Sequence, residues 1–275
     1  MDIVQYNKNI VEKQKKSNED VGLVSIITPS YNCACYIGET IKSILSQTYK
    51  NWELLLVDDC STDTTDAVVA SFGDPRIRYF KNEKRSGAAV SRNRALREAK
   101  GRWIAFIDSD DLWMPTKLEQ QIRFMVENGY GVSCTDYIEI NKYSRELGIY
   151  ITAPKHISKW TMYAYCWLGC LTVMYDVQKI GLIQVVDLKK NNDYAMWLQV
   201  CRKENCHLLK EPLAKYRRRE QSISNHSYIS LIKWHYRLFR HAENMNSLSA
   251  GFMTGINMVF GMMKKMLYMK RYHVD

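Results

Sequence analysis

The sequence lacks several patterns that would assign a function at once. No two of its eight cysteines form a CxxC pair of the kind that binds zinc, and its six histidines show no metal-ligand spacing. The phosphate-binding pattern GxxxxGK followed by Ser or Thr and the dinucleotide-binding pattern GxGxxG are both missing. "GAAVSRN" at residues 87–93 is too poor in glycine to replace either of them. Cysteines without zinc spacing are most simply explained by a thiol-reducing cytosol.

Long apolar runs are also scarce at the start of the chain. Residues 1–20 contain neither the apolar core of a signal peptide nor a span of about 20 apolar residues, so we expect a flexible leader and no export. The whole chain has 275 residues, of which 46% are apolar and 25% charged, as is ordinary for a soluble protein. This composition excludes disorder of the whole chain.

Positive charge is concentrated at the C-terminal end. Residues 201–275 hold 14 Lys and Arg against 5 Asp and Glu, a net charge of +9, whereas the first 200 residues hold 25 against 24, a net charge of +1. The basic end predicts an anionic partner, either a membrane surface or a nucleic acid. No recognised nucleic-acid-binding motif accompanies it, so we expect no nucleic acid partner.

Apolar runs and amphipathic helical patterns alternate from Val21 onward. The sequence predicts strands at residues 24–28, 52–59, 77–80 and 103–108, with helices between them near 36–47, 61–72 and 88–99. Ser61 or Thr62 is the expected cap of the second helix. This alternation predicts an α/β fold, a mostly parallel Rossmann-like sheet flanked by helices.

Polar segments follow three of the predicted strands. They are "PSYN" at residues 29–32, "DDCSTD" at 58–63 and "DSDD" at 108–111. Each alone could be a helix cap or a solvated turn. All three nevertheless lie at carboxyl ends of strands, the edge at which open α/β sheets bind ligands.

Three carboxylates within four positions repel one another unless a cation neutralises them. A hard divalent cation with oxygen ligands, Mn or Mg, suits such a group. Mg typically binds one or two carboxylates together with substrate phosphates, so the segment at 108–111 predicts a nucleotide diphosphate ligand.

Together these segments resemble glycosyltransferase family 2, inverting enzymes with the GT-A fold. The resemblance rests on residues 24–63, on "SGAAVSRNRALREAKGRWIAFIDSDDLWMPTKLEQQ" at 86–121 and on "NNDYAMWL" at 191–198. "GCLTVMYD" at 169–176 is most similar to the branch that builds bacterial capsule, teichuronic acid and lipopolysaccharide chains. The resemblance implies a nucleotide-sugar donor, most simply UDP-linked, and a glycan or lipid-linked acceptor. The processive QxxRW pattern is absent, which favours transfer of single residues.

The resemblance also implies where the nucleoside of the donor binds. Pro29 and Tyr31 correspond to the loop that packs on the base. Asp59, the second residue of the "VDD" pair, corresponds to the acceptor for the uracil N3 proton, with Asp58 beside it.

The "DSDD" segment corresponds to the family's DxD pair. The resemblance makes Asp110 the direct metal ligand and gives Asp108 a contact with ribose or a metal-bound water, with Ser109 between them at the donor. Asp111 either supports the ligands from outside or caps a helix beginning near Pro115.

Two further basic or polar regions are candidates for the diphosphate. Arg92 and Asn93 lie near it by resemblance, although exposed helix positions explain them equally well. Arg217 or a neighbour in "KYRRREQSIS" at residues 215–224 could close over the phosphates as a bidentate donor, or belong to a solvated basic turn.

An inverting transfer needs a base for the acceptor hydroxyl. Asp193 in "NNDYAMWL" corresponds to the aspartate of the family's Glu-Asp pair, with Trp197 one helical turn away. Asn192 stands where the family has Glu, so an acceptor contact by that position is in doubt. The alternative is that Asp193 caps the helix that follows.

Two other function classes share part of this pattern. A receiver-type Mg-binding signalling domain places its acidic pair after the first strand, whereas Asp58 and Asp59 follow the second. An aspartate-dependent phosphatase of the DxDxT type expects Thr where Leu112 stands. Neither class fits as well as a metal-dependent hexosyltransferase.

The pattern divides the chain into four parts. We expect a leader at 1–20, a nucleotide-sugar-binding half at 21–115, an acceptor-binding and catalytic half at 116–227, and a basic helical tail at 228–275. The tail could lie on the inner face of the cytoplasmic membrane, making the enzyme peripheral, or pack on the catalytic domain or on a second subunit of a homo-oligomer. The membrane reading rests on apolar residues at helical spacing with cations nearby: Phe252, Ile256, Val259, Phe260, Met263, Leu267, Lys264, Lys265, Lys270 and Arg271.

Overall fold

The computed structural model describes residues 21–219 and 228–274. The predicted leader at 1–20 and the second half of the basic segment at 215–224 therefore lie outside the described residues. None of the helices within the described ranges combines the length and the hydropathy needed to cross a bilayer.

The centre of the fold is a block of parallel strands. β1 (Val24–Ser30) lies between β2 (Trp52–Asp58) and β4 (Trp103–Phe106), and β3 (Ile77–Lys81) pairs with β2, all in parallel. Side chains alternate across these strands, so that Leu54 and Leu56 join one apolar cluster while Leu55 and Val57 join the other. Burial on both faces explains why these strands are continuous apolar runs in the sequence.

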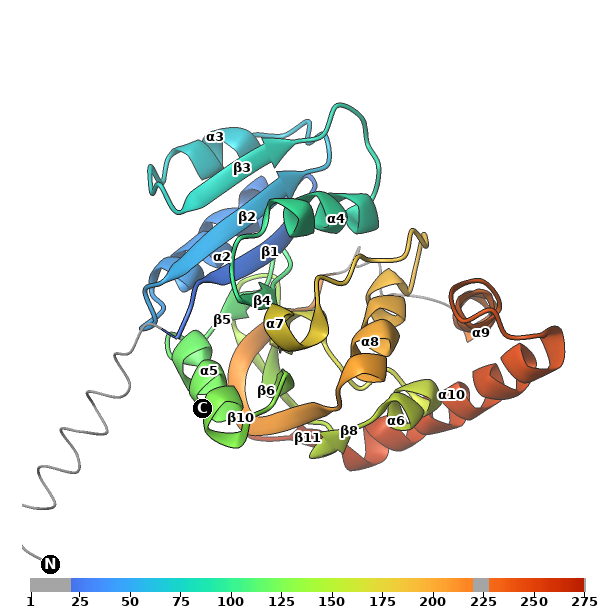
Figure 1. Ribbon diagram of the computed structural model, residues 1–275. Helices are drawn as coiled ribbons and strands as arrows, with labels where there is room; N and C mark the ends of the chain where they lie inside the picture. The colour runs from blue at the N-terminus through green and yellow to red at the C-terminus, as the bar shows by residue number, and fades with distance from the viewer. Residues whose placement is uncertain (1–20, 220–227, 275) are drawn as a thin grey trace, which may run out of the picture.

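The sheet continues beyond β4 with mixed strand directions (Figure 1). β9 (Met174–Asp176) runs antiparallel to both β4 and β6 (Val132–Ile140), followed by β7 (Glu146–Ile151) and β11 (Met269–Arg271). β10 (Cys206–Arg217) runs parallel to β6 and antiparallel to β5 (Leu112–Trp113) and β8 (His156–Ile157).

Helices cover both faces of the sheet. α2 (Ala34–Leu45) buries Ile37, Ile41 and Ile44 in the cluster on one face, and α3 (Thr65–Ala70) and α5 (Lys117–Asn128) contribute to the same cluster. α4 (Ala88–Glu98) and α8 (Asn192–Lys203) belong to the cluster on the other face. The remaining elements are α6 (Lys159–Ala164), a 3-10 turn (Cys170–Thr172), α7 (Val177–Ile180), α9 (Tyr228–Arg237), a π turn (Leu238–Ala242) and α10 (Ser247–Leu267). The predicted α/β class and the C-terminal helices are confirmed.

Two local predictions are wrong. α3 begins at Thr65 with Thr64 at its cap position, whereas Ser61 instead donates to the Asp58 carboxylate. The tail is not purely helical either, because it ends in β11, which pairs with β7 as an edge strand.

Candidate active site

The three predicted polar segments meet at the carboxyl edge of the parallel strands. The Asn32 backbone N–H donates to Ser61 Oγ over 2.8 Å, which joins the loops after β1 and β2. Cys33 Sγ donates to the Ser109 carbonyl over 3.3 Å, which joins the loop after β1 to the loop after β4. The predicted gathering of these segments at one edge is confirmed.

Asp59 is held by the loop at residues 82–87, to which the sequence assigned no role. The carboxylate is 4% exposed and accepts the backbone N–H groups of Ser86 at 2.8 Å and Gly87 at 2.7 Å, together with Asn82 Nδ2 at 3.0 Å. Gly87 has φ of 91°, a region that glycine adopts readily and other residues rarely do. Asp58 is fully buried and accepts from the Ser61 backbone. Both aspartates therefore build the wall of this edge.

Tyr31 lies at the mouth of the same region. Its ring is half-buried, and the Arg85 guanidinium lies 4.0 Å from the ring centroid, over its face. Pro29 is buried within β1 and pairs in register with Val57. The loop at 82–87 thus contributes both the groups that hold Asp59 and a cation that stacks on Tyr31.

Each carboxylate of the 108–111 segment has its own basic or amide partner. Asp108 Oδ1 lies 2.6 Å from Arg92 Nη2, and Asp110 Oδ2 lies 2.6 Å from Arg219 Nε. Asp111 is 1% exposed and accepts the Arg217 backbone N–H at 2.8 Å. The arrangement separates the three charges that the sequence places side by side.

Burial and mutual repulsion change the ionisation of this segment. Burial raises the pKa of Asp110 to about 6, and the charge of Asp108 adds to the rise while Arg219 opposes it. Burial also raises the pKa of Asp111 well above its usual range, with Asp110 and Asp108 acting in the same direction. Asp111 therefore holds a proton more readily than an ordinary aspartate. It does not cap a helix near Pro115, because α5 begins at Lys117 with Thr116 at its cap position.

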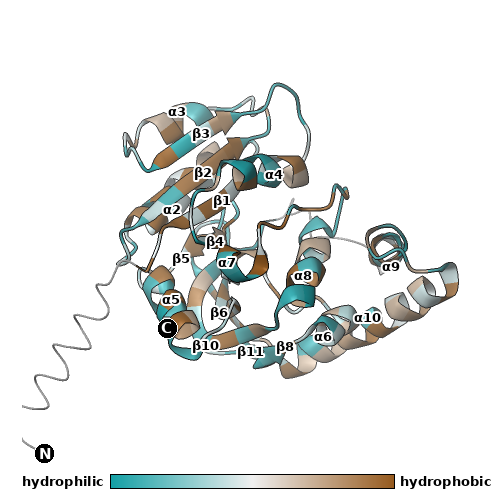
Figure 2. Cartoon of the chain, in the orientation of Figure 1, coloured by the Kyte–Doolittle hydropathy of each residue, from teal (hydrophilic) through white to brown (hydrophobic). Residues whose placement is uncertain are grey.

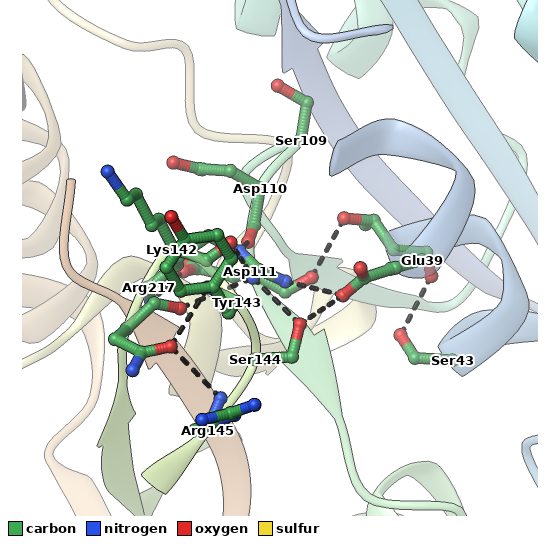
Figure 3. Close-up of polar contacts among 12 residues, drawn as sticks. Glu39, Ser43, Ser109, Asp110, Asp111, Lys142, Tyr143, Ser144, Arg145 and Arg217 are labelled. Atoms are coloured by element: carbon green, nitrogen blue, oxygen red, sulfur yellow. Dashed lines mark hydrogen bonds and ion pairs between the residues drawn. The ribbon is translucent and has the colours of Figure 1, made fainter. Parts of the chain in front are cut away.

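Arg217 supports the segment from behind (Figure 3). Its side chain is fully buried, Nε donates to the Asp110 carbonyl over 2.6 Å, Nη2 pairs with Glu39 at 2.8 Å, and Nη1 donates to Ser144 Oγ at 2.8 Å. These contacts are with protein groups on the far side of the segment from Ser109. Among the described basic residues that follow Arg217 in this segment, Arg219 is the one whose guanidinium pairs with the Asp110 carboxylate.

Arg92 connects two parts of the site that are far apart in the sequence. It is 6% exposed, so the alternative of an exposed helix position is wrong. One arm of its guanidinium contacts Asp108, and the other donates from Nη1 to Asn192 Oδ1 over 3.1 Å. Asn93 instead forms two hydrogen bonds with the Val185 backbone, at 2.6 and 2.8 Å, and so fixes the chain between α7 and α8.

Asp193 lies in the first turn of α8 and is half-buried. The helix begins at Asn192 with Asn191 at its cap position, so the alternative that Asp193 caps this helix is wrong. One turn later, Trp197 is fully buried and packs edge-to-face on Phe106, with ring centroids 5.1 Å apart. Because Phe106 ends β4, this contact and the Arg92 bridge hold the first turn of α8 beside the 108–111 segment.

The donor set suits an oxygen-binding divalent cation that is shared with a substrate. Within residues 21–219 and 228–274, no three His, Cys, Asp or Glu side chains are grouped so that they could hold a metal ion alone. Asp108 and Asp110 nevertheless provide two carboxylates, and the raised pKa of Asp110 shows the cost of burying a negative charge there without a cation, to which the charge of Asp108 adds. Mg and Mn commonly take one or two carboxylates together with substrate phosphates, so the residues fit such an ion.

The sequence reasoning missed two groups of functional interest. The loop at 82–87 carries no strong motif, and its contacts with Asp59 and Tyr31 become visible only when β3 is placed beside β2. The pairing of Arg92 with Asn192 spans 100 positions in the chain. The only signal for that pairing was the departure at Asn192 itself.

Comparisons with known proteins agree with this geometry. The family model described as "Glycosyl transferase family 2" matches residues 25–172. TuaG of Bacillus subtilis, whose name assigns it to teichuronic acid biosynthesis, is 38% identical over 83% of this chain and 91% of its own length. WfgD of Escherichia coli, a "UDP-Glc:alpha-D-GlcNAc-diphosphoundecaprenol beta-1,3-glucosyltransferase", is 41% identical over 76% of this chain and 82% of its own length.

Solved structures show the same fold at low sequence identity. Residues 1–349 of TarS from S. aureus, crystallised with UDP-GlcNAc, superpose with a TM-score of 0.67 at 21% identity, covering 84% of this chain and 70% of that one. The mannosyltransferase PcManGT from Pyrobaculum calidifontis, in complex with GDP-Man and Mn²⁺, gives a TM-score of 0.58 at 16% identity, covering 87% and 75%. The family match leaves no support for a receiver domain or a DxDxT phosphatase. The chain belongs to glycosyltransferase family 2 and is a glycosyltransferase of the GT-A fold.

Proposed function

We propose that the chain transfers one sugar from a UDP-linked donor to a hydroxyl group of a lipid-linked or polysaccharide acceptor, with inversion at the anomeric carbon. The observation that carries the proposal is the Arg92 bridge, which holds Asp108 and the first turn of α8, with Asp193, at one site. The names of TuaG and WfgD support an acceptor in cell-surface glycan synthesis, and the UDP-GlcNAc complex of TarS supports a uridine donor.

The nucleoside would bind at the edge formed by the loops after β1 and β2. Tyr31 offers an aromatic face to the base, and Asp59 offers carboxylate oxygens to a ring N–H. Because Asp59 already accepts two backbone N–H groups from Ser86 and Gly87, its position is fixed before the donor arrives. Fixed acceptors reduce the entropy lost on binding.

Asp193 would take the proton from the acceptor hydroxyl. In a single displacement the acceptor oxygen forms a bond to the anomeric carbon while the bond from that carbon to the diphosphate oxygen breaks, and the hydroxyl proton moves to the base. The first turn of α8 fixes Asp193 relative to the donor through Trp197 and Phe106. Rigid placement of the base and donor is the main contribution that the chain makes to this step.

Asp110 and Asp108 would hold Mn²⁺ or Mg²⁺ with the diphosphate. When bound, that ion supplies positive charge that stabilises the nucleoside diphosphate as it leaves. Arg219 contacts Asp110 and Arg92 contacts Asp108, so each carboxylate is oriented by a guanidinium. Asn192 would help to orient the Arg92 guanidinium by accepting a hydrogen bond from it. The Glu that the family has at this position could form a charged contact instead.

A panel of donors tests the proposal. Purified protein is incubated with Mn²⁺, a polyprenyl-diphosphate sugar acceptor and, in turn, UDP-Glc, UDP-GlcNAc, UDP-Gal and GDP-Man, and the release of nucleoside diphosphate is measured. The proposal expects acceptor-dependent release from at least one UDP-sugar and none from GDP-Man. Release from GDP-Man alone would overturn the assignment of the donor.

A further inference from the structure

α10 is built with its polar side facing inward. The buried residues of this helix are small or polar: Ala250 is fully buried, Thr254 is 5% exposed and Asn257 is 1% exposed, with Met253 and Phe260 only partly buried beside them. The residues on the opposite side are large and apolar, with exposures of 87% for Leu248 and 70% for Phe252. This is the reverse of the usual surface helix, whose apolar stripe faces the core.

The outward residues form one continuous stripe along the helix. At 100° per residue, positions 248, 252, 259 and 266 fall within a narrow sector, whereas positions 250, 254 and 257 fall on the opposite side. Three further apolar residues of α10 widen this face, and two apolar residues of the neighbouring α9 are also exposed. We call the outer face the α10 stripe, and its members and their exposures are Leu248 (87%), Phe252 (70%), Val259 (51%), Met262 (59%), Met263 (39%), Met266 (81%) and Leu267 (59%), with Ile229 (81%) and Ile232 (47%) on α9.

α10 lies along one edge of the molecule, remote from β2, β3 and α3 (Figure 1). Figure 2 shows α10 in white and brown along most of its length, with little teal. Beside it, α6 presents Trp160, which is 70% exposed and lines a hollow of about 370 Å³ together with Met253 and Ile256 of α10. Large apolar and aromatic groups of two helices therefore share this surface.

The positive charge of the same region favours an anionic partner. Residues 228–274 hold seven Lys and Arg against one acidic residue, Glu243, a net charge of +6 from 7 − 1. Glu243 is paired with Arg202, so it does not offset the cations at the surface. Two copies meeting through this face would bring like charges together, because a two-fold interface repeats the same patch on both sides.

We propose that the α10 stripe, with Trp160, lies on an anionic lipid surface. The apolar side chains would enter the boundary between headgroups and acyl chains, and exposed Lys265, Lys270 and Arg271 would meet the negative headgroups. If the helix continued, Lys270 would fall on the apolar stripe, four positions after Met266. In the structure Lys270 belongs to β11 and leaves the helix uninterrupted.

The helix that would dock is in direct contact with α8, which carries the proposed base. Asn257, on the inward side of α10, donates from Nδ2 to the Tyr194 hydroxyl over 2.8 Å. Tyr194 follows Asp193, the proposed base, in the first turn of α8. The docking inference goes beyond the proposed function, and vesicle binding is measured without any transfer, so the two can fail separately.

Flotation with vesicles tests the inference on the full chain. Vesicles of phosphatidylcholine alone are compared with vesicles containing about one-third phosphatidylglycerol, at low salt and at 0.5 M salt. We expect binding to the anionic vesicles at low salt, and release at high salt because surface charges are screened. Protein that stays unbound at low salt would overturn the inference.

Two sets of substitutions separate the apolar from the charged contribution. Phe252→Gln with Val259→Gln and Met266→Gln should lower the partition coefficient by about tenfold or more, since three apolar side chains would no longer be buried. Removing the charge of Lys265 should lower it by roughly fivefold, from about 1 kcal/mol for each near-surface cation. The matched control is Val126→Gln on α5, where the valine is 46% exposed but far from the stripe in sequence.

Folding and assembly are checked on the same samples. All substituted side chains are exposed, so the thermal midpoints should match that of the wild type. The control variant should bind as the wild type does. If the triple variant binds vesicles like the wild type, or if the wild type is a dimer in solution and the triple variant a monomer, the stripe serves another partner and the inference fails.

Discussion

Arg92 is the residue whose replacement discriminates best between a bridged site and a set of independent contacts. Its guanidinium contacts Asp108 at 2.6 Å with one arm and Asn192 at 3.1 Å with the other. Lysine retains the charge but has a single nitrogen on a flexible stem, so Arg92→Lys cannot keep both contacts in this geometry. The substitution therefore opens the bridge without removing the cation.

The burial of the two partners determines how much stability Arg92→Lys should lose. Breaking a fully buried ion pair typically costs about 3–5 kcal/mol, but the Asp108 side chain is 35% exposed, so water replaces part of the lost contact. One neutral hydrogen bond contributes about 1 kcal/mol and a charged one about 1.5–3 kcal/mol. We expect Arg92→Lys to lower the free energy of unfolding by about 1–2 kcal/mol and Asn192→Ala by about 1 kcal/mol.

The two variants should also be coupled. Because both remove the same contact, the double variant should lose less stability than the sum of the single losses, by roughly 0.5 kcal/mol or more. Transfer activity should fall by roughly tenfold to a hundredfold in Arg92→Lys, since small displacements of reacting groups have large effects on rate. Urea unfolding and steady-state kinetics measure the two effects separately.

A matched control lies on the same helix. Arg97 is exposed, and Arg97→Lys should change neither stability nor activity. The reasoning would be refuted if Arg92→Lys unfolded at the same urea concentration as the wild type and kept its kcat, or if the losses of Arg92→Lys and Asn192→Ala were simply additive.

Three further predictions concern single side chains. Asp110→Asn should abolish the Mn²⁺- or Mg²⁺-dependence of transfer together with the activity while the thermal midpoint is kept, and an active variant or full activity in EDTA would contradict the metal assignment. Asp193→Asn should lose turnover but bind the UDP-sugar with unchanged affinity in calorimetry, because a base acts in the transition state; lost donor binding with unchanged turnover would contradict this. Lys117 is buried and donates to Gln121 over 2.6 Å, and burial lowers its pKa from 10.5 to about 7. The unfolded chain therefore holds the proton more tightly, so stability should rise between about pH 7 and 10.5 by on the order of a few kcal/mol. Lys117→Met should remove that rise, and an unchanged pH profile in urea unfolding would show that the wild-type lysine is not desolvated.

The central strands could be predicted because strands that are buried on both faces have continuous apolar sequences. Leu54 to Val57 place apolar side chains on both faces of β2, and the polar ends of β1, β2 and β4 meet as the parallel arrangement requires. Periodicity and strand-end chemistry are local signals. They are enough to predict where the polar segments meet, because neighbouring parallel strands align their carboxyl ends.

The partners of the acidic segment could not be predicted in the same way. Arg219 reaches Asp110 only because β10 pairs with β5 and β6. No local sequence pattern predicts that pairing. The raised pKa of Asp111 likewise depends on burial by distant elements. Long-range contacts of this kind need the tertiary fold.

The helical tail could be predicted, but the orientation of its apolar face could not. Helical spacing predicted α10, but periodicity alone did not tell which side faces the protein. Ile256 and Phe260, expected on the outer stripe, are partly buried, while Leu248 and Met266 are more exposed than either. The short strand β11 was missed because three residues carry too little pattern to be recognised.

The central claim is that a sugar passes from a UDP-linked donor to the acceptor in a single inverting displacement. The most direct measurement is the anomeric configuration of the product, read by NMR after reaction of an α-linked UDP-sugar with a lipid-diphosphate sugar acceptor in the presence of Mn²⁺. The account predicts a β-linked product that forms with the wild type and not with Asp193→Asn. An α-linked product, or a β-linked product formed equally well by Asp193→Asn, would contradict it.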